Sequence, residues 1–375
     1  MFAHNVLRIA ELVVGTLTIV LVLNDVFQSV IVPRAAGRRY RISSNITRPS
    51  WQLWRWYALR IDDTERREDF LATYAPLMLV VFLIVWVAGL VFGYGLLFDA
   101  LADQVRPRPG FGAALYFAGT SLLTIGYGDF VPLTGAARFL ALAAGASGFG
   151  TVAVVTAFLF SLFGAFSRRE VFVILFGARA GAPPSGVTLL ETYARLGMRA
   201  DLPDIFKEGQ HWAADVLESH LAYPILAYFR SPHDYESWVG ALGAVLDAST
   251  LLLTAVRNES FGHARLMNDI GRHLTHDLGR YFALEVRHAV GVERSEFDTA
   301  RERLRDAGFD VIDGDSAWEA FATLRRFYAA PLEAMTRYWR IPPAQWVGDR
   351  STLPARHGNE EVPQELREEQ MRPIG

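Results

Sequence analysis

Two long segments without a charged residue constrain the fold more than any other feature of the sequence. Residues 74–98 and residues 139–167 contain no Asp, Glu, Lys or Arg. Each is longer than the roughly 20 residues that a helix needs to cross the hydrocarbon core of a bilayer. Inside a bilayer the backbone must bond within the protein, which leaves helices and closed barrels as spanning structures. These segments therefore predict an all-α membrane protein.

A third apolar segment, residues 12–32, is interrupted by Asn24 and Asp25. A secretory signal is a poor interpretation, because residues 1–5 carry no Lys or Arg and no cleavage pattern follows. We expect a retained transmembrane helix. Asp25 has two interpretations: a functional carboxylate inside the membrane with Arg34 as its partner, or a residue at the headgroup boundary.

The placement of arginine predicts the orientation of the spans. Cytoplasmic flanks of membrane helices carry an excess of Lys and Arg. We therefore expect a multi-pass protein of the cell (inner) membrane, with its N-terminus outside and its C-terminus in the cytoplasm. The residues that mark the two cytoplasmic flanks are Arg34, Arg38, Arg39, Arg41, Arg48, Arg55 and Arg60 after the first span, and Arg168 and Arg169 after the last.

The linker after the first span combines aromatic and basic residues. Trp51, Trp54, Trp56 and Tyr57 lie close to Arg55 and Arg60. This mixture is typical of a helix in the headgroup layer. A packed turn with buried tryptophans is the alternative.

A short apolar segment, residues 113–123, has only 11 residues and cannot span a bilayer. It must enter and return, and the irregular backbone after it is tolerated only where protein covers it or where it lines a water-filled path. Gly126 and Gly128 permit positive φ angles, which let successive carbonyls face one axis. Carbonyl oxygens without a fixed charge suit a dehydrated monovalent cation rather than Ca²⁺, since Asp129 follows the last glycine.

Thr124 to Asp129 read Thr-Ile-Gly-Tyr-Gly-Asp, which resembles the TxGYGD signature of the bacterial pore-loop potassium channels. The resemblance covers roughly residues 74–167 and implies an outer helix, a re-entrant pore helix, a selectivity filter and an inner helix. It implies that the filter contains Thr124, Ile125, Gly126, Tyr127 and Gly128 and that the carbonyls of the first four bind K⁺. One chain supplies one filter strand, so the resemblance implies a homotetramer in the lipid bilayer.

The resemblance also implies roles for residues near the filter. Tyr116 and Phe117 fall where aromatic residues brace the filter tyrosine, and ordinary packing is their alternative role. Asp129 corresponds to an aspartate that bonds to the pore helix, but Thr120 stands where some members carry an acid. Leu123 replaces a frequent second threonine.

The expected inner helix contains Gly145, Gly148 and Gly150. Gly148 matches the hinge position of the family, and glycine softens a helix by about 1 kcal/mol relative to alanine. The alternative is that small residues allow helices to approach closely. Thr151 and Thr156, further along, are candidates for lining the cavity.

The C-terminal half mixes charged and apolar residues, as water-soluble helical domains do. Residues 239–256 are apolar apart from Asp247, and we expect a buried helix there rather than a fourth span. Ser185, Ser295 and Ser316 resemble helix N-caps. The predicted domains are a transmembrane helix (1–33), a linker (34–73), the pore domain (74–167), a connector (168–186), a helical cytoplasmic domain (187–348) and a disordered tail (349–375).

Composition excludes several function classes. The net charge of −3 argues against a nucleic-acid partner, and the chain has no cysteine for disulfides or thiol chemistry. His233-Asp234 and the pair His273 and His276 do not make a metal-dependent enzyme. We expect no enzyme activity and no cofactor besides K⁺ ions in the filter. The regulator of the cytoplasmic domain is unknown, and a non-conducting membrane scaffold is the alternative function.

Overall fold

The computed structural model describes residues 2–30, 42–232, 236–259, 261–286, 291–342 and 344–347. The predicted tail, the His233-Asp234 pair and the arginines 34–41 lie outside these residues. The chain forms two compact units, the first with residues 1–169 and 215–230, the second with residues 170–214 and 231–375. Two of the three boundaries fall within helices α6 and α8, and the third lies between Arg230 and Ser231. Each unit is described by itself.

The first unit contains the membrane helices, and the prediction of an all-α membrane protein is confirmed. Three stretches here, Asn5–Ser29, Thr64–Ala100 and Gly135–Ala180, are long and apolar enough to cross a membrane. Helices of this unit in chain order are α1 (Phe2–Val30), α2 (Ile42–Ala58), α3 (Thr64–Ala72), α4 (Tyr74–Ala100), α5 (Phe111–Leu122) and α6 (Gly135–Ala180), with the 3₁₀ helices η2 (Ala102–Gln104) and η4 (Pro224–Tyr228).

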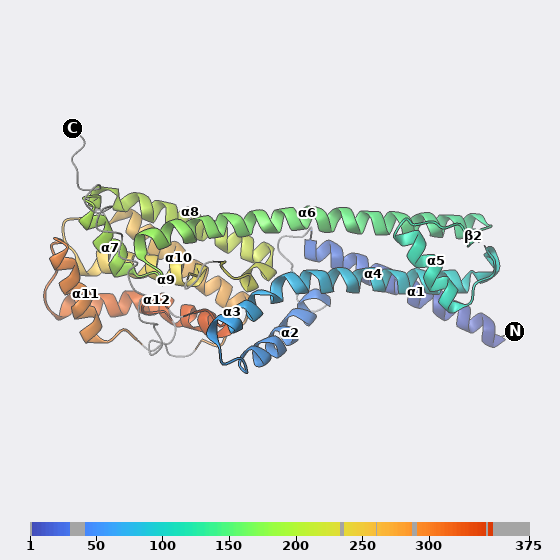
Figure 1. Ribbon diagram of the computed structural model, residues 1–375, viewed down its shortest axis with the longest axis horizontal. Helices are drawn as coiled ribbons and strands as arrows, with labels where there is room; N and C mark the ends of the chain where they lie inside the picture. The colour runs from blue at the N-terminus through green and yellow to red at the C-terminus, as the bar shows by residue number, and fades with distance from the viewer. Residues whose placement is uncertain are drawn as a thin grey trace, which may run out of the picture. The chain divides into compact units, whose positions relative to one another are not determined.

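Helix α1 packs along α4, as Figure 1 shows. A glycine allows the close approach: a Cβ at Gly15 would lie 2.7 Å from the carbonyl oxygen of Gly93. Ile19, Val22 and Val26 on the same side of α1 are buried. The N-terminal apolar segment thus packs as part of the first unit, and its retention as a transmembrane helix stays a prediction.

Helix α6 is 46 residues long and continues through part of the stretch that the sequence predicted as a connector, ending at Ala180. At 1.5 Å per residue it extends about 69 Å, more than twice the hydrocarbon thickness of a bilayer. The reason is local: residues 168–176 contain no glycine or proline that would stop the helix.

A two-stranded clasp closes the loop that contains α5. Strand β1 (Val105–Arg106) pairs with β2 (Val131–Pro132) in antiparallel register. The amide of Leu133 adds a 2.8 Å hydrogen bond to the carbonyl of Gln104. The pairing holds the two ends of the loop together. Each strand is only two residues long, so the pair does not form an extended sheet.

Helix α2 divides the aromatic residues of the linker between two environments. Trp51 is 1% exposed, and the Trp54 indole donates to the Phe70 carbonyl at 3.0 Å. Trp56 and Tyr57 are exposed on the other side of the helix. Trp51 is therefore buried and Trp54 is half-buried, whereas headgroup placement stays a prediction for Trp56 and Tyr57.

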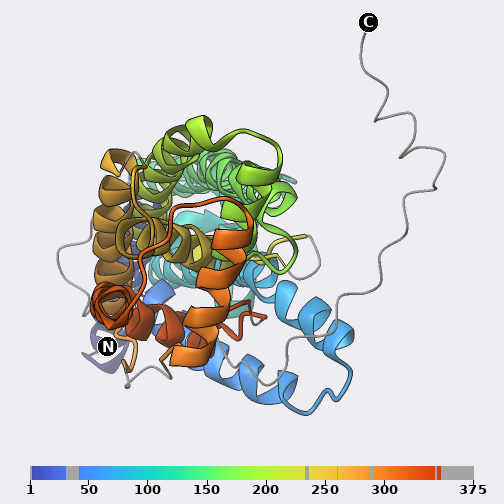
Figure 2. The ribbon, with the colours of Figure 1, turned by 90° about the vertical axis from the view of Figure 1, so that its left-hand side faces the viewer.

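The second unit gathers around α9, with α7, α10 and α12 packed against it (Figures 1 and 2). Although α9 is apolar enough to count as a candidate span, 94% of its most apolar window is buried in protein, as expected for a core helix. The elements assigned to this unit, or begun in it, are α7 (Gly186–Arg195), η3 (Arg199–Asp201), α8 (Leu202–Ala222), α9 (Trp238–Ala255), α10 (Gly262–Tyr281), α11 (Arg294–Asp306) and α12 (Asp315–Trp339).

The core of this unit contains an ion pair between Asp247 of α9 and Arg325 of α12, with Nε to Oδ1 at 2.9 Å. The Tyr328 hydroxyl donates to the same carboxylate oxygen at 2.7 Å. Burial, reinforced by the charge of Asp247, raises the pKa of Tyr328 well above its usual value, so that the hydroxyl keeps its proton and remains a donor.

Helix starts in this unit follow the predicted caps only in part. Ser185 accepts the amide of Thr188 and caps α7 as expected. The capping box of α11 uses Glu293 with Glu296 instead of Ser295 with Asp298. Helix α12 starts at Asp315, after Gly314, so Ser316 lies inside its first turn.

Candidate functional site

The predicted filter begins where α5 ends. After Leu122 the chain leaves the helix, and the carbonyl of Thr120 accepts the amide of Ile125 at 2.8 Å. The φ angles are +56° at Thr124, +61° at Gly126 and +82° at Gly128, whereas the residues between them have negative φ. Alternating signs of φ turn successive carbonyls to the same side. Only threonine incurs the cost of about 1–2 kcal/mol that a Cβ adds at positive φ.

The whole segment is exposed within one chain. Residues 123–129 all belong to the exposed class, and Tyr127 is 71% exposed. Irregular backbone at membrane depth must be covered by protein or must line water. The chain by itself does not supply that cover, which leaves a water-filled path or cover by another chain.

The aromatic residues of α5 surround Phe130. Phe117 is buried, with its ring 4.5 Å from that of Phe98 and 6.0 Å from that of Phe130. Tyr116 is 43% exposed, and its ring lies 6.2 Å from that of Phe130. The expected connection between Asp129 and the pore helix and the bracing of Tyr127 both stay predictions.

Thr120 stands at the pore-helix position where some members of the family carry an acidic residue, and its contacts are to the backbone. Its hydroxyl donates to the Phe117 carbonyl at 3.1 Å, inside α5, and the residue is buried. Its backbone carbonyl holds the amide of Ile125. Thr120 therefore supports the filter through the main chain.

Gly148 is where α6 meets the end of α5. A Cβ at Gly148 would lie 1.8 Å from the Leu122 carbonyl oxygen, and one at Gly145 would lie 3.4 Å from that of Ser121. Helix α6 runs unbroken through both positions. The structure therefore requires glycine at position 148 for close packing beneath the filter, and a hinge at Gly148 stays a prediction.

The two threonines expected along the cavity differ in exposure. Thr151 is 4% exposed, and its hydroxyl donates to the Ser147 carbonyl at 2.7 Å. It is buried inside the chain, so its assignment to a water-filled cavity is wrong. Thr156 is exposed and remains a candidate.

Asp25 is buried against the middle of α4. It is 2% exposed, and the Trp86 indole donates to its Oδ2 at 2.8 Å. Trp86 lies close to the midpoint of the 27-residue helix α4. Asp25 is thus paired with a neutral donor of α4, and both interpretations of its depth in the membrane stay predictions.

A segment that the sequence did not single out holds the end of the inner helix. This segment, residues 215–230, is termed the collar. Arg169 of α6 is 1% exposed, and its guanidinium donates to the carbonyls of Leu226 at 3.0 Å and Phe229 at 2.9 Å. The collar thereby satisfies the buried charge at the end of the uncharged part of α6.

His220 completes this arrangement. Its Nδ1 lies 2.8 Å from the Val216 carbonyl and must carry the proton, because a carbonyl oxygen only accepts. Its Nε2, 3.3 Å from Nη1 of Arg169, then accepts from the guanidinium. Burial, and next the charge of Arg169, hold the pKa of His220 well below its usual value, so the ring is neutral.

The collar also contacts the outer elements of the same unit. Tyr228 packs against Trp51 at 5.1 Å and Tyr74 at 5.4 Å between ring centroids. Arg230 forms an ion pair with Glu68 of α3. One segment thus joins the inner helix to α2, α3 and α4. The one hint of the collar in the sequence is the basic residue Arg169, which follows the uncharged stretch of α6 and needs acceptors if it is buried.

Residues 79–165 match the family model described as "Ion channel". This range includes most of α4, all of α5, the filter segment and α6 up to a point just before Arg168. The match and the apolar helices together support a membrane ion channel. No curated protein and no solved structure gives a significant match to the chain.

Substitution of Gly148 tests the packing beneath the filter. Gly148→Ala should lower the free energy of unfolding by about 1–3 kcal/mol, because the added methyl group overlaps the Leu122 carbonyl. Gly150→Ala is the control, since a Cβ there meets nothing within 4 Å. Thermal unfolding in detergent, followed by tryptophan fluorescence, measures both. Equal melting temperatures would contradict the account.

Proposed function

We propose that this protein is a subunit of a potassium-selective channel that conducts K⁺ passively through a homotetrameric pore. The observation that carries the proposal is the filter segment, in which residues with positive and negative φ alternate over the sequence Thr-Ile-Gly-Tyr-Gly. Carbonyl oxygens arranged in this way replace the hydration shell of a monovalent cation. K⁺ is the transported ion, not a cofactor.

The exposure of the filter supports the tetramer. One strand supplies one oxygen at each level, whereas a ring around an ion needs several, and a closed ring of identical chains satisfies this by symmetry. Leu142 and Phe149 of α6, 74% and 72% exposed, add apolar surface for neighbouring copies or lipid. The second unit is proposed to lie in the cytoplasm and the N-terminus outside, as arginine placement predicts.

The collar supports a mechanism of gating. An inner-helix gate opens when the ends of the inner helices move apart, and Arg169 ties this end to carbonyls of the collar. The collar is flanked in sequence on both sides by residues of the second unit. A change in that unit can therefore pull on the collar, and through Arg169 on α6. Gating by an inner-helix bundle coupled to the cytoplasmic domain is proposed on this basis.

Flux through liposomes tests selectivity. Vesicles that contain the protein and are loaded with K⁺ should release it faster than empty vesicles, and Na⁺ should pass far more slowly. Gly126→Ala should abolish the K⁺ flux, because a Cβ at φ +61° is strained and redirects a ligand carbonyl. Gly112→Ala, at an open position of α5, should leave the flux unchanged.

Equal K⁺ and Na⁺ fluxes would contradict selectivity. Absence of any flux, with a folded and membrane-inserted protein, would favour the alternative of a non-conducting scaffold. Normal K⁺ flux through the Gly126→Ala variant would contradict the proposal that this segment is the selectivity filter.

Substitution of Arg169 tests the coupling. Arg169→Gln should change the open probability in single-channel recordings and destabilise the first unit by about 1–3 kcal/mol for each buried carbonyl left without its donor. Arg179→Gln is the control, because Arg179 also lies on α6 but pairs with Glu208, outside the collar. If the Gln variant does not fold, Arg169→Lys keeps the charge and still loses the two-carbonyl geometry. An open probability that is unchanged in both Arg169 variants would contradict coupling through the collar.

A further inference from the structure

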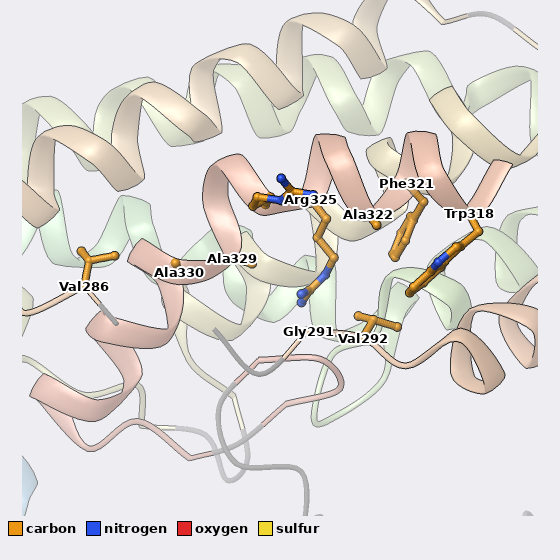
Figure 3. Close-up of a pocket in the computed structure, with 10 residues that line it drawn as sticks. Val286, Gly291, Val292, Trp318, Phe321, Ala322, Arg325, Ala329 and Ala330 are labelled. Atoms are coloured by element: carbon orange, nitrogen blue, oxygen red, sulfur yellow. The ribbon is translucent and has the colours of Figure 1, made fainter. Parts of the chain in front are cut away.

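A cavity of about 540 Å³ lies beside α12 in the second unit, and neither the filter nor the collar includes it. This size falls within the range of about 300–1,000 Å³ that small-molecule sites occupy. Figure 3 shows Trp318 and Phe321 projecting from α12 toward Val292, with Arg325 further along the helix. The walls are mostly apolar, so a bound molecule needs an apolar body.

The polar side chains of the lining are all hydrogen-bond donors. Among the described residues that line the cavity, only Trp318, Arg325 and Arg326 have polar side chains, and none carries a carboxylate, amide or hydroxyl group. A ligand that binds there must therefore supply the acceptors. An anionic group does this best, because hydrogen bonds between charged partners are the strong ones.

Arg325 is positioned as a buried anchor. It is 5% exposed, its Nε donates to Asp247 at 2.9 Å, and its Nη2 donates to the Trp346 carbonyl. Nη1 forms no hydrogen bond with any residue in the described part of the chain. Burial opposes the charge of Arg325, but Asp247 outweighs it and keeps the pKa raised, so the group stays a cation.

Arg326 supplies the positive charge that is not balanced. It is exposed, and within the described ranges it forms neither an ion pair nor a hydrogen bond. Asp247 offsets the charge of Arg325, which leaves one net positive charge from the two arginines. One negative charge on the ligand would balance it.

We propose that this cavity binds a small aromatic monocarboxylate, with its ring against Trp318 and its carboxylate at the guanidinium groups of Arg325 and Arg326. Phe321 is 0% exposed, and its ring lies 6.2 Å from that of Trp318 at an interplanar angle of 27°. It therefore holds the half-buried Trp318 indole in place as the aromatic surface for the ligand. Binding is a property of the second unit. A role of the ligand in opening or closing the pore rests on the proposed channel function.

Calorimetric titration of the full chain in detergent with 2-naphthoate tests the site, after subtraction of a titration into empty micelles. We expect one molecule per chain. Its neutral analogue, 2-naphthalenemethanol, should bind at least about tenfold more weakly, because it lacks the charge that the arginines bind. Absence of saturable 2-naphthoate binding, or equal binding of the alcohol, would overturn the proposal.

Two pairs of variants locate the site. Arg326→Gln should weaken 2-naphthoate binding about tenfold, whereas Arg195→Gln, an exposed arginine of α7 outside the lining, should not. Ala322→Leu fills the cavity and should abolish binding, whereas Ala320→Leu adds the same volume at an exposed position of α12. Binding that persists unchanged in Arg326→Gln and Ala322→Leu would show association elsewhere and overturn the proposal.

The liposome flux assay separates this proposal from the proposed function. A change of K⁺ flux with 2-naphthoate that Ala322→Leu removes supports a regulatory ligand site. Saturable binding without any effect on an intact K⁺ flux overturns the regulatory role and leaves the binding site standing. A protein that binds 2-naphthoate at this site but conducts no ion refutes the channel function alone.

Discussion

Backbone exposure at the filter is the constraint on which the rest of the structure depends. From Leu123 to Asp129 the chain is irregular, exposed and placed between two membrane helices. A bilayer does not satisfy such carbonyls, so they need either a neighbouring protein or an ion and water. Three contacts hold this segment in place. They are the pairing of β1 with β2, the hydrogen bond to the Thr120 carbonyl, and the close packing of Gly148 against the end of α5.

The same unit carries two buried charges whose partners explain their positions. Asp25 lies near the middle of α4 and is bonded to Trp86, and Arg169 lies at the end of the uncharged stretch of α6 and is bonded to collar carbonyls. Asp25 accepts from a neutral indole, and Arg169 donates to neutral carbonyls. This leaves each helix fixed to a specific neighbour: α1 to α4, and α6 to the collar.

The sequence predicts features whose cause is local. Charge-free runs predicted the spans, the glycine spacing predicted positive φ at Gly126 and Gly128, and Ser185 was recognised as a cap from its immediate neighbours. Errors arose where two local patterns competed. Ser295 with Asp298 and Glu293 with Glu296 have the same spacing two residues apart, and only the fold selects the second.

Contacts between residues far apart in the chain could not be predicted from the sequence. Trp86 lies 61 positions from Asp25, and Phe229 lies 60 from Arg169, so neither pair leaves a periodic pattern. The phase of α6 was also unpredictable, because a run without charges shows no polar face; Thr151 was therefore placed in a cavity, although it is buried. The cavity beside Trp318 requires α12 to lie close to Gly291 and Val292, which come shortly before α11, and only the folded chain shows this.

Native mass spectrometry of the intact protein, released from detergent under gentle activation, tests the central claim most directly. The claim is that the exposed filter is completed by identical copies. The account predicts a complex with four times the 41.8 kDa mass of the chain. A protein that is folded and membrane-inserted but remains a monomer or dimer would leave the filter open and would contradict the account.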